Sequence, residues 1–446
     1  MSKVSYCHSL LYATEATEDL ANLLIESTCK EMARAFIISS GSEAIEAALK
    51  MTRQYHLEKS PPEPSRTHVI ARQQSYHGTT LGALAVGGHV ARRALYEPIL
   101  SQNSSHVSPC YAYRGMRSIL DSKTAYLKRL EDELDAEFQR LGPQNIAAFI
   151  AEPVVGAALG CVPPVEGYFA AVRRICDRYG ALLIMDEIMS GCGRVGPEPS
   201  PRYKRPLHAW QDPLIGVVPD IMCMGKGLGG GYQPVAAMLA NHKVIDVLDA
   251  GTGAFSHGQT YQGHPVACRA AAEVQRIIRE EDLVGNVREK GKLLGELLTA
   301  KVGAHWAVGD VRGKGLFWGI EFVSNKATKE PYEPGEGIAM GLHELGNVHP
   351  PISSQHSLTP RAQPSNPPST SPSTPAPAPP TANAATTSCS RRRTTSPTRT
   401  SGRSSTRPRP RSRGSSSCMR TAASRERRRR GVGRGLMRLL EGRERF

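Results

Sequence analysis

Residues 147–186 contain two short, uninterrupted apolar runs separated by an amphipathic segment, and this pattern constrains the fold more than any other feature. Residues 147–151 and 181–185 have the length and composition of buried strands. Between them, residues 167–180 place apolar side chains at helical spacing, and Gly180 is a typical helix stop. A strand, a helix and a second strand predict a parallel βαβ unit. We therefore expect an α/β fold with a central, mostly parallel sheet.

Each predicted strand is followed directly by a carboxylate, Glu152 after the first and Asp186 after the second. In open parallel sheets, ligands bind at the carboxyl ends of the strands. The two acids are therefore candidates for a binding site at one edge of the sheet. Capping of nearby backbone groups is the alternative for both.

The sequence Ser-Gly-Ser-Glu at residues 40–43 matches a capping box, with Ser40 as the N-cap and Glu43 three residues later. The following residues place apolar side chains on one face of a helix, at positions 44, 47, 48, 51 and 55. Free N–H groups and the helix dipole favour a phosphate at such a start. Gly41 and Ser42 are thus candidate phosphate ligands, and a capping box without a ligand is the alternative.

The chain has 446 residues and a formal net charge of +15, but the positive charge is concentrated near one end. Residues 347–446 contain 20 Arg, no Lys and 3 acidic residues, which leaves 36 basic and 38 acidic residues in positions 1–346. The Arg-, Pro- and Ser-rich composition of residues 347–446 predicts disorder. It is typical either of a nucleic-acid-binding tail or of GC-rich DNA translated out of frame or through an intron. We favour the second origin and expect no nucleic-acid partner.

Other classes of protein are excluded by composition. The ten cysteines form no C-x-x-C pair and no Cys/His cluster at zinc spacing, so we expect no metal site. No uncharged apolar run is long enough to span a membrane, and acidic residues interrupt the first 24 residues, where a signal peptide needs an apolar stretch. We expect reduced thiols, a cytoplasmic location and no membrane partner.

Five segments, in this order and approximate spacing, resemble the class III pyridoxal-phosphate-dependent aminotransferases of fold type I. They are SGSEA at 40–44, SYHGTTLG at 75–82, MDEIMSGCGR at 185–194, PDIMCMGKGLGGG at 219–231 and HGQTYQGHP at 257–265. The resemblance covers most of residues 9–346. It implies a partial N-terminal segment at 1–34, a cofactor-binding large domain at 35–269 and an incomplete α+β small domain at 270–346, followed by the tail at 347–446.

The resemblance implies that Lys226 forms a Schiff base with pyridoxal 5′-phosphate and that Asp186 keeps the pyridine nitrogen protonated. This chemistry needs a primary amine that can be neutral near pH 7, which desolvation or a neighbouring cation can provide. Glycines on both sides of Lys226 let the backbone pass close to a bound ring. For a Gly-Lys-Gly sequence alone, a solvated lysine in a turn is the alternative.

The resemblance assigns contacts to other residues of the same segments. It implies that the phosphate lies on Gly41 and Ser42, that Tyr76 stacks on the pyridoxal ring with His77 beside it, and that Ile188 covers the opposite ring face. A Tyr–His pair of the core and an ordinary isoleucine at a sheet end are the alternatives.

Two further residues are assigned by the resemblance alone. Thr260 matches the threonine that reaches the phosphate of the neighbouring subunit's cofactor, which implies a homodimer with shared active sites. Glu152 matches an acid near the substrate.

Residues 181–187 also match a Walker B strand, so a P-loop ATPase has to be considered. A P-loop requires G-x-x-x-x-G-K-[ST]. Around Lys226, the first glycine position is Asp220 and the residue after the lysine is Gly227. The phosphate cradle and the hydroxyl for Mg²⁺ are both missing, so this class is excluded.

The chain departs from the family pattern at four places. The region before Gly41 is short, and residues 197–206 form an insertion whose four prolines exclude a helix or a central strand. Met189 replaces a glutamine that touches the phenolic oxygen of the cofactor in many relatives. After Gly346, no arginine that could hold a substrate carboxylate is apparent.

The expected function is transamination between a primary amine or amino acid and an oxo-acid. Lys226 would move a proton between the substrate α-carbon and the cofactor as general base and acid. Another pyridoxal phosphate reaction, such as racemisation or decarboxylation, and a relic that binds the cofactor without turnover are the alternatives. Nucleic-acid binding by the tail is a more remote one.

Overall fold

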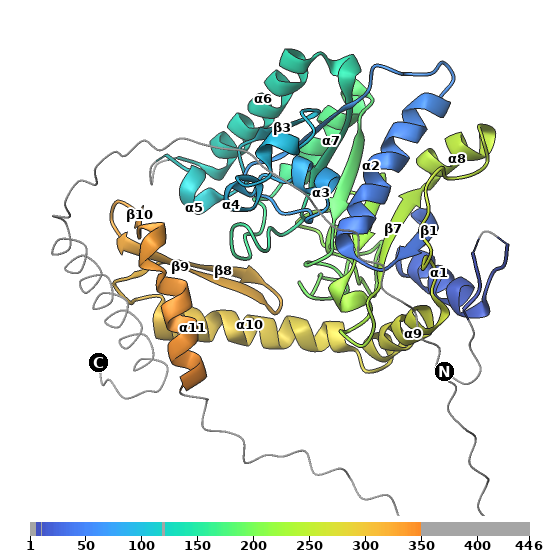
Figure 1. Ribbon diagram of the computed structural model, residues 1–446. Helices are drawn as coiled ribbons and strands as arrows, with labels where there is room; N and C mark the ends of the chain where they lie inside the picture. Colours follow the sequence, from blue (N-terminus) through green and yellow to red (C-terminus); the bar gives the residue numbers. More distant parts are fainter. Residues whose placement is uncertain (1–5, 10, 118–120, 349–446) are drawn as a thin grey trace, which may run out of the picture. The chain divides into compact units, whose positions relative to one another are not determined.

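The computed structural model describes residues 6–9, 11–117 and 121–348 (Figure 1). Described residues up to Ile338 belong to one compact unit, and those from Ala339 onward belong to a second. Helix α11 (Ile338–Val348) runs from the first into the second. Most of the predicted tail, residues 349–446, lies outside the described residues.

Seven strands form the central sheet, in the order β1-β7-β6-β5-β4-β2-β3. The pairs from β6 to β3 are parallel, whereas β7 is antiparallel to both of its neighbours. The strands are β1 (Met32–Ile38), β2 (His68–Arg72), β3 (Ser104–Val107), β4 (Ile146–Ala151), β5 (Leu182–Asp186), β6 (Ile221–Met224) and β7 (Ala236–Asn241). The expectation of a mostly parallel α/β sheet is confirmed.

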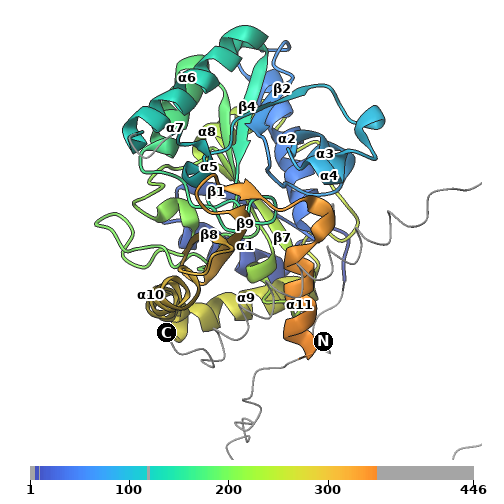
Figure 2. The ribbon, with the colours of Figure 1, turned by 90° about the vertical axis from the view of Figure 1, so that its left-hand side faces the viewer.

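Helices cover both faces of this sheet, and successive strand residues point to opposite cores. In β5, Leu183 and Met185 pack into one core, while Leu182 and Ile184 pack into the other. Figure 2 shows α6 and α7 on one side of the strands and α2 and α3 on the other. The first core also contains α1 (Glu15–Ser27), α6 (Lys123–Leu141), α7 (Tyr168–Tyr179) and α9 (Pro265–Glu280). The second contains α2 (Gly41–Glu58), α3 (Leu81–Val86) and α8 (His242–Ala250).

The predicted βαβ unit is present as β4, α7 and β5. Gly180 ends α7 in the left-handed conformation, with φ +70°, and its N–H donates to the carbonyl groups of Asp177 and Cys176. Residues 197–206, with their four prolines, contain neither helix nor strand.

The predicted capping box at α2 is half right. Ser40 Oγ accepts a hydrogen bond from the Glu43 N–H at 3.3 Å, as an N-cap should. Glu43 does not return the bond, because its Oε2 is buried without a hydrogen-bond partner. The apolar face predicted for this helix is buried in the second core.

The sequence of residues 270–300 predicts one helix, but the structure has two, α9 and α10 (Leu283–Val302), because the chain breaks at Asp282, whose φ is +46°. A separate antiparallel sheet follows, made of β8 (Val308–Lys314), β9 (Phe317–Asn325) and β10 (Glu330–Pro331). The sequence also predicts a strand at 315–322, and β9 begins two residues later because residues 315–316 form the turn from β8. The short helices α4 (Val90–Arg93) and α5 (Ala112–Gly115) lie in connections. None of the described helices is long and apolar enough to cross a membrane.

Candidate active site

The carboxyl ends of five strands bring the predicted site residues to one edge of the central sheet. Strand β1 runs parallel to β6, since both are antiparallel to β7. Gly41 follows β1, His77 follows β2, Glu152 follows β4, Asp186 ends β5 and Lys226 follows β6. This is the edge at which α/β sheets bind ligands.

These residues line one pocket of about 130 Å³, together with neighbours from the same loops. Its lining consists of Ser40, Gly41, Ser42, Tyr76, His77, Gly78, Glu152, Asp186, Ile188, Met189 and Lys226. Every residue predicted for the site is in this set except Thr260. Segments that are far apart in sequence therefore meet in space as the pattern predicted.

Asp186 is held in place by two hydrogen bonds at the floor of the pocket. His77 Nδ1 lies 2.8 Å from Asp186 Oδ2, and the Ile188 N–H donates to Asp186 Oδ1 at 3.0 Å. Both side chains are almost fully buried, and His77 Nε2 has no hydrogen-bond partner in the part of the chain that the structure describes. The arrangement fixes a carboxylate at the end of β5 with defined orientation.

Glu152 is buried beside this pair. Its Oε2 accepts from the Tyr76 N–H at 3.2 Å and its Oε1 from the Gly156 N–H at 3.0 Å. Burial raises the pKa of Glu152; His77 opposes this shift, and the charge of Asp186 reinforces it. Because each oxygen accepts a backbone bond, the carboxylate joins the loops after β2 and β4, and the capping alternative fits as well as a substrate contact.

The turn at the start of α2 has room only for glycine. A Cβ on Gly41 would lie 2.8 Å from Ile188 Cδ1. Gly78 has φ +134°, and a Cβ there would lie 2.6 Å from Ser42 Oγ. Ser42 Oγ also accepts from the Thr79 N–H at 3.0 Å, which ties the loop after β2 to the helix start.

Lys226 begins the 3₁₀ turn η4 (Lys226–Leu228) with φ +42°. Residues other than glycine rarely adopt this backbone conformation. Such strain is common at functional sites. The side chain is exposed, so burial does not provide the desolvation expected for it.

Gln275 of α9 holds the turn that Lys226 begins, and sequence analysis did not find this residue. Its Nε2 donates to the carbonyl groups of Gly227 at 3.3 Å and Leu228 at 2.9 Å. No sequence signal marks a single glutamine on a helical face as the partner of a turn 47 and 48 residues earlier.

Two side chains modify the walls of the pocket. The Arg92 guanidinium lies 4.7 Å from the centre of the Tyr76 ring and covers part of it. A Cβ added to Gly156 would lie 2.5 Å from Met189 Sδ and 3.1 Å from Phe317 Cζ, so Met189 packs beside Gly156. Met189 thus presents apolar atoms to the pocket at the position where the resemblance implies a glutamine.

Glu187 is a second buried acid that sequence analysis missed. Its oxygens accept from the N–H groups of Trp210 at 2.7 Å and Ala209 at 2.9 Å, so it anchors the loop that follows the insertion. Burial raises the pKa of Glu187 to about 7, against the effect of these two donors. His208 Nδ1 lies 3.9 Å away, and burial lowers the pKa of that imidazole to about 3.

Thr260 is not brought to the pocket. It is exposed, and its carbonyl accepts a hydrogen bond from the Tyr6 hydroxyl at 2.8 Å. The assignment of Thr260 to a partner subunit's cofactor stays a prediction.

The family model described as "Aminotransferase class-III" matches residues 1–351. The chain belongs to the class III aminotransferases. Members of this family depend on pyridoxal phosphate, and the resemblance inferred from the five segments is confirmed.

This class III aminotransferase is 51% identical over 346 residues to an aminotransferase of Gibberella zeae and 44% identical over 347 residues to an uncharacterized aminotransferase of Schizosaccharomyces pombe. The matches cover 77% and 78% of this chain, and 65% and 72% of the relatives. The chain thus spans slightly less than two thirds of the first relative.

Solved transaminases share the fold. A transaminase solved with L-alanine matches with a TM-score of 0.71 and 32% identity, covering 78% of this chain and 79% of the other. An amine transaminase from an uncultivated Pseudomonas species, solved in its PLP-bound (internal aldimine) form, matches with a TM-score of 0.68 and 36% identity, covering 75% and 72%.

Proposed function

We propose that this chain catalyses pyridoxal 5′-phosphate-dependent transamination between a primary amine or amino acid and an oxo-acid. The observation that carries the proposal is the convergence of Lys226, Asp186 and the Gly41 turn on one pocket at the carboxyl edge of the sheet. The aldehyde of the cofactor requires an amine, which Lys226 provides, and its pyridine nitrogen requires a fixed carboxylate, which Asp186 provides. Its phosphate requires a helix start, which the Gly41 turn provides.

The described residues fit this cofactor. The Gly41 and Gly78 positions leave a cradle that a Cβ would fill, next to the free N–H groups of α2. Hydrogen bonds with Ile188 and His77 hold Asp186 Oδ1 and Oδ2 in place, so this carboxylate can accept a hydrogen bond from a protonated ring nitrogen. When bound, pyridoxal phosphate supplies an electron sink that acidifies the α-C–H of an attached amine.

The chain's own residues supply positioning and proton transfer. Lys226 Nζ is exposed and makes no hydrogen bond or ion pair to the described residues, so it is available to take the proton from the substrate α-carbon and return it. Asp186 stabilises positive charge at the ring nitrogen, and His77 positions Asp186. Tyr76 and Ile188, from the loops after β2 and β5, both line the pocket and would hold the ring between them.

Met189 and Phe317 shape the substrate side of the proposal. Both side chains lie beside Gly156, and Met189 lines the pocket, so its apolar atoms favour substrates with an apolar group at that side. Glu152 is proposed to lie near the substrate amine.

A homodimer completes the proposal. The Thr260 hydroxyl is exposed and makes no hydrogen bond among the described residues, which leaves it available to a partner subunit's phosphate. The eight described cysteines are all free thiols, in keeping with the proposed cytoplasmic location.

The test is covalent labelling of the full chain. We expect a visible absorption band on addition of pyridoxal phosphate, and modification of Lys226 on borohydride reduction and peptide mapping. Lys226→Ala should show neither, and Lys292→Ala, at an exposed lysine outside the pocket, should show both. An unmodified Lys226 in the wild type would exclude the proposal.

Turnover separates this reaction from its alternatives. We expect keto-product from mixed amines only when pyruvate or 2-oxoglutarate is present. Release of CO₂ without an acceptor would indicate decarboxylation, and inversion of the amino acid would indicate racemisation. A labelled Lys226 without turnover would indicate a cofactor-binding relic.

A further inference from the structure

Gln275 is a buried glutamine of α9 that contacts the turn begun by Lys226, and it is only 7% exposed. Its Nε2 donates to the carbonyl oxygens of Gly227 at 3.3 Å and Leu228 at 2.9 Å, which uses both hydrogens of the amide. The two residues directly after Lys226 are therefore tied to a helix from a later part of the chain.

The backbone of this turn sets the direction of the Lys226 side chain. That side chain lines the cofactor pocket, is exposed, and makes no hydrogen bond or ion pair to the described residues. Its φ of +42° lies in the left-handed region, and relaxation to a negative φ would turn Cβ, and with it Nζ, in a different direction. The turn must therefore be held if the amine is to stay directed into the pocket.

Packing holds the residues on each side of Lys226 against the loop after β5. A Cβ on Gly225 would lie 3.3 Å from Ile188 Cγ2, and one on Gly227 would lie 3.0 Å from Cys192 Cβ. These apolar contacts provide no hydrogen bond to the carbonyl groups of the turn. Gln275 provides two.

The Gln275 amide is itself incomplete, because its Oε1 is buried without a hydrogen-bond partner among the described residues. A buried acceptor in this state costs stability. A methionine of similar length would avoid that cost, but it has no donor for the turn. The two bonds to the turn therefore explain a glutamine at this position better than core packing does.

Gln211 is a second buried glutamine, and it shows what a structural amide looks like in this fold. Its Oε1 accepts from the N–H groups of Leu207 at 2.8 Å and His208 at 3.0 Å, and its Nε2 donates to the Ser27 carbonyl at 3.0 Å. Both ends of this amide are paired, and Gln211 does not line the cofactor pocket. It is the matched control for Gln275.

We propose that Gln275 is a positioning residue that holds the turn so that Lys226 Nζ is directed at the substrate α-carbon for proton transfer. It acts through the backbone of residues 227 and 228 and does not line the cofactor pocket. The inference rests on the proposed function, because that function assigns proton transfer to Lys226.

Kinetics of Gln275→Met, in the full chain loaded with pyridoxal phosphate, test the proposal. We expect kcat to fall about 10²-fold, because a displacement of about 1 Å can cost this much. The KM of the amine should change less than about twofold. Deuterium at the substrate α-carbon should slow the variant more than the wild type, because proton transfer becomes the slow step. A wild-type kcat and isotope effect in the variant would overturn the proposal.

Gln211→Met separates positioning from support of the fold. This variant leaves three backbone groups without their partner, so it should lower the unfolding temperature more than Gln275→Met does. Its kcat and isotope effect should match those of the wild type. If Gln211→Met lowered kcat and raised the isotope effect as much as Gln275→Met, the role assigned to Gln275 would be refuted.

Gln275→Glu provides a conservative rescue and decides the matter if Gln275→Met does not fold. Burial favours the protonated carboxyl, which can donate one hydrogen bond to the turn, whereas the ionised carboxylate cannot donate. The kcat of this variant, relative to the wild type, should therefore fall as pH rises from about 6 to 9. A ratio that does not change with pH would contradict the proposal.

Hydrogen exchange of the cofactor-free chain distinguishes this inference from the proposed function. Peptides that cover residues 225–232 should exchange faster in Gln275→Met than in the wild type, and peptides that cover β4 should not. Equal exchange over residues 225–232 would overturn the inference whether or not the cofactor binds. If pyridoxal phosphate gives no visible band with the wild type, the proposed function fails, and the exchange data still decide whether Gln275 holds the turn.

Discussion

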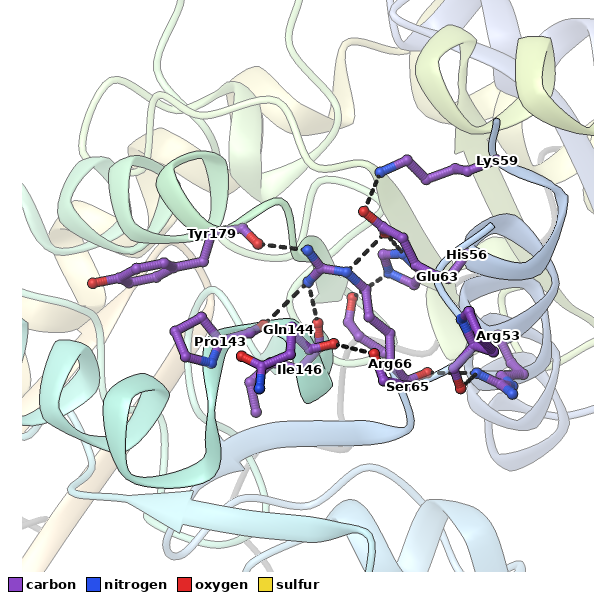
Figure 3. Close-up of polar contacts among 12 residues, drawn as sticks. Arg53, His56, Lys59, Glu63, Ser65, Arg66, Pro143, Gln144, Ile146 and Tyr179 are labelled. Atoms are coloured by element: carbon purple, nitrogen blue, oxygen red, sulfur yellow. Dashed lines mark hydrogen bonds and ion pairs between the residues drawn. The ribbon is translucent and has the colours of Figure 1, made fainter. Parts of the chain in front are cut away.

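The amino and carboxyl ends of the parallel strands both hold buried charged side chains, but the two sets have different partners. Arg66 lies just before β2 and is 7% exposed. It donates to the carbonyl groups of Ile146 at 2.6 Å and Tyr179 at 2.8 Å, and its Nε lies 2.7 Å from Glu63 Oε2 (Figure 3). We call Arg66 and its partners, including His56 and those drawn in Figure 3, the Arg66 network.

In the Arg66 network, Glu63 also contacts His56 and Lys59. His56 Nε2 lies 2.9 Å from the Ala147 carbonyl, and its Nδ1 lies 2.8 Å from Glu63 Oε2. Lys59 Nζ donates to Glu63 Oε1 at 2.8 Å. The network joins the end of α2 to the starts of β2 and β4, which is a structural role.

At the carboxyl edge, the unusual features lie at or beside the pocket. His77 Nε2 and Glu43 Oε2 are buried without hydrogen-bond partners, and Lys226 is held in a strained backbone conformation. Buried polar groups without partners are uncommon and cost stability. The comparison teaches that the buried charges at the amino ends are engaged by carbonyl groups and an ion pair, whereas a strained lysine and an imidazole nitrogen without a partner among the described residues lie in the pocket proposed to hold a ligand.

The sharpest test of this contrast is Lys226→Gly. We expect transaminase activity to fall about 10⁴-fold or more, because the proton-transfer group is removed. The free energy of unfolding should rise by about 1 kcal/mol, because glycine adopts a positive φ without strain. Activity assays and urea unfolding measure the two effects, and a clear loss of stability would contradict the contrast.

Asp186→Asn should have the next largest effect. The amide keeps the size of the side chain but loses the charge, so we expect kcat/KM to fall about 10² to 10³-fold. Thermal unfolding of the cofactor-free protein should change little. If unfolding changes more than activity, Asp186 belongs with the structural residues of the comparison.

Arg66→Met reverses the pattern. The substitution removes the guanidinium from Glu63, which keeps only Lys59 as a cation, and from the carbonyl groups of Ile146 and Tyr179. We expect a loss of about 3 kcal/mol in the free energy of unfolding. The kcat of the folded fraction should stay unchanged. Arg140→Met, at an exposed ion pair with Glu137, serves as the control and should cost under about 1 kcal/mol.

A smaller expected effect is that the stability contributions of Glu187, at the carboxyl edge, and Glu63, at the amino edge, depend on pH in opposite directions. Burial raises the pKa of Glu187 to about 7, so its contribution to stability is present below its ordinary pKa near 4.5 and is lost as pH rises through 7. Burial also acts on Glu63, but hydrogen bonds from Lys59 and His56 and the charge of Arg66 outweigh it and lower that pKa. Its contribution is therefore present at neutral pH and is lost as pH falls.

Urea unfolding below pH 5 measures the Glu63 effect, and urea unfolding between pH 5 and 8 measures the Glu187 effect. Relative to Glu187→Gln, the wild type should lose about 2 kcal/mol as pH rises over this range. Glu63→Gln should remove part of the stability that the wild type loses on acidification below pH 5. Parallel curves for wild type and Glu187→Gln would show that Glu187 does not take up a proton on folding.

Sequence predicted the elements whose signals are local. The apolar runs predicted β4 and β5, and Gly180 predicted the end of α7. The residues that follow the strands predicted the pocket, because the carboxyl ends of parallel strands lie at one edge of the sheet. The break at Asp282 was missed, since a left-handed aspartate carries no periodic signal.

The hydrogen-bond partners of buried polar side chains could not be predicted from the sequence, because they too carry no local signal. Glu187 and Gln275 each bind backbone groups of a distant turn, and backbone N–H and carbonyl groups are identical at every position of a sequence. Only the fold decides which of them a side chain meets. Residues 349–446, predicted to be disordered, lie outside the described residues.

The order of strands in the sheet has a consequence for synthesis. Within the described residues, β1 pairs only with β7, so the first strand made must wait for the last before it joins the sheet. The turn at Gly41 therefore gains a paired strand in front of it only after translation has passed Asn241. A ribosome-bound chain that stops earlier can assemble β2 to β6, but the strand that leads into this turn is still unpaired.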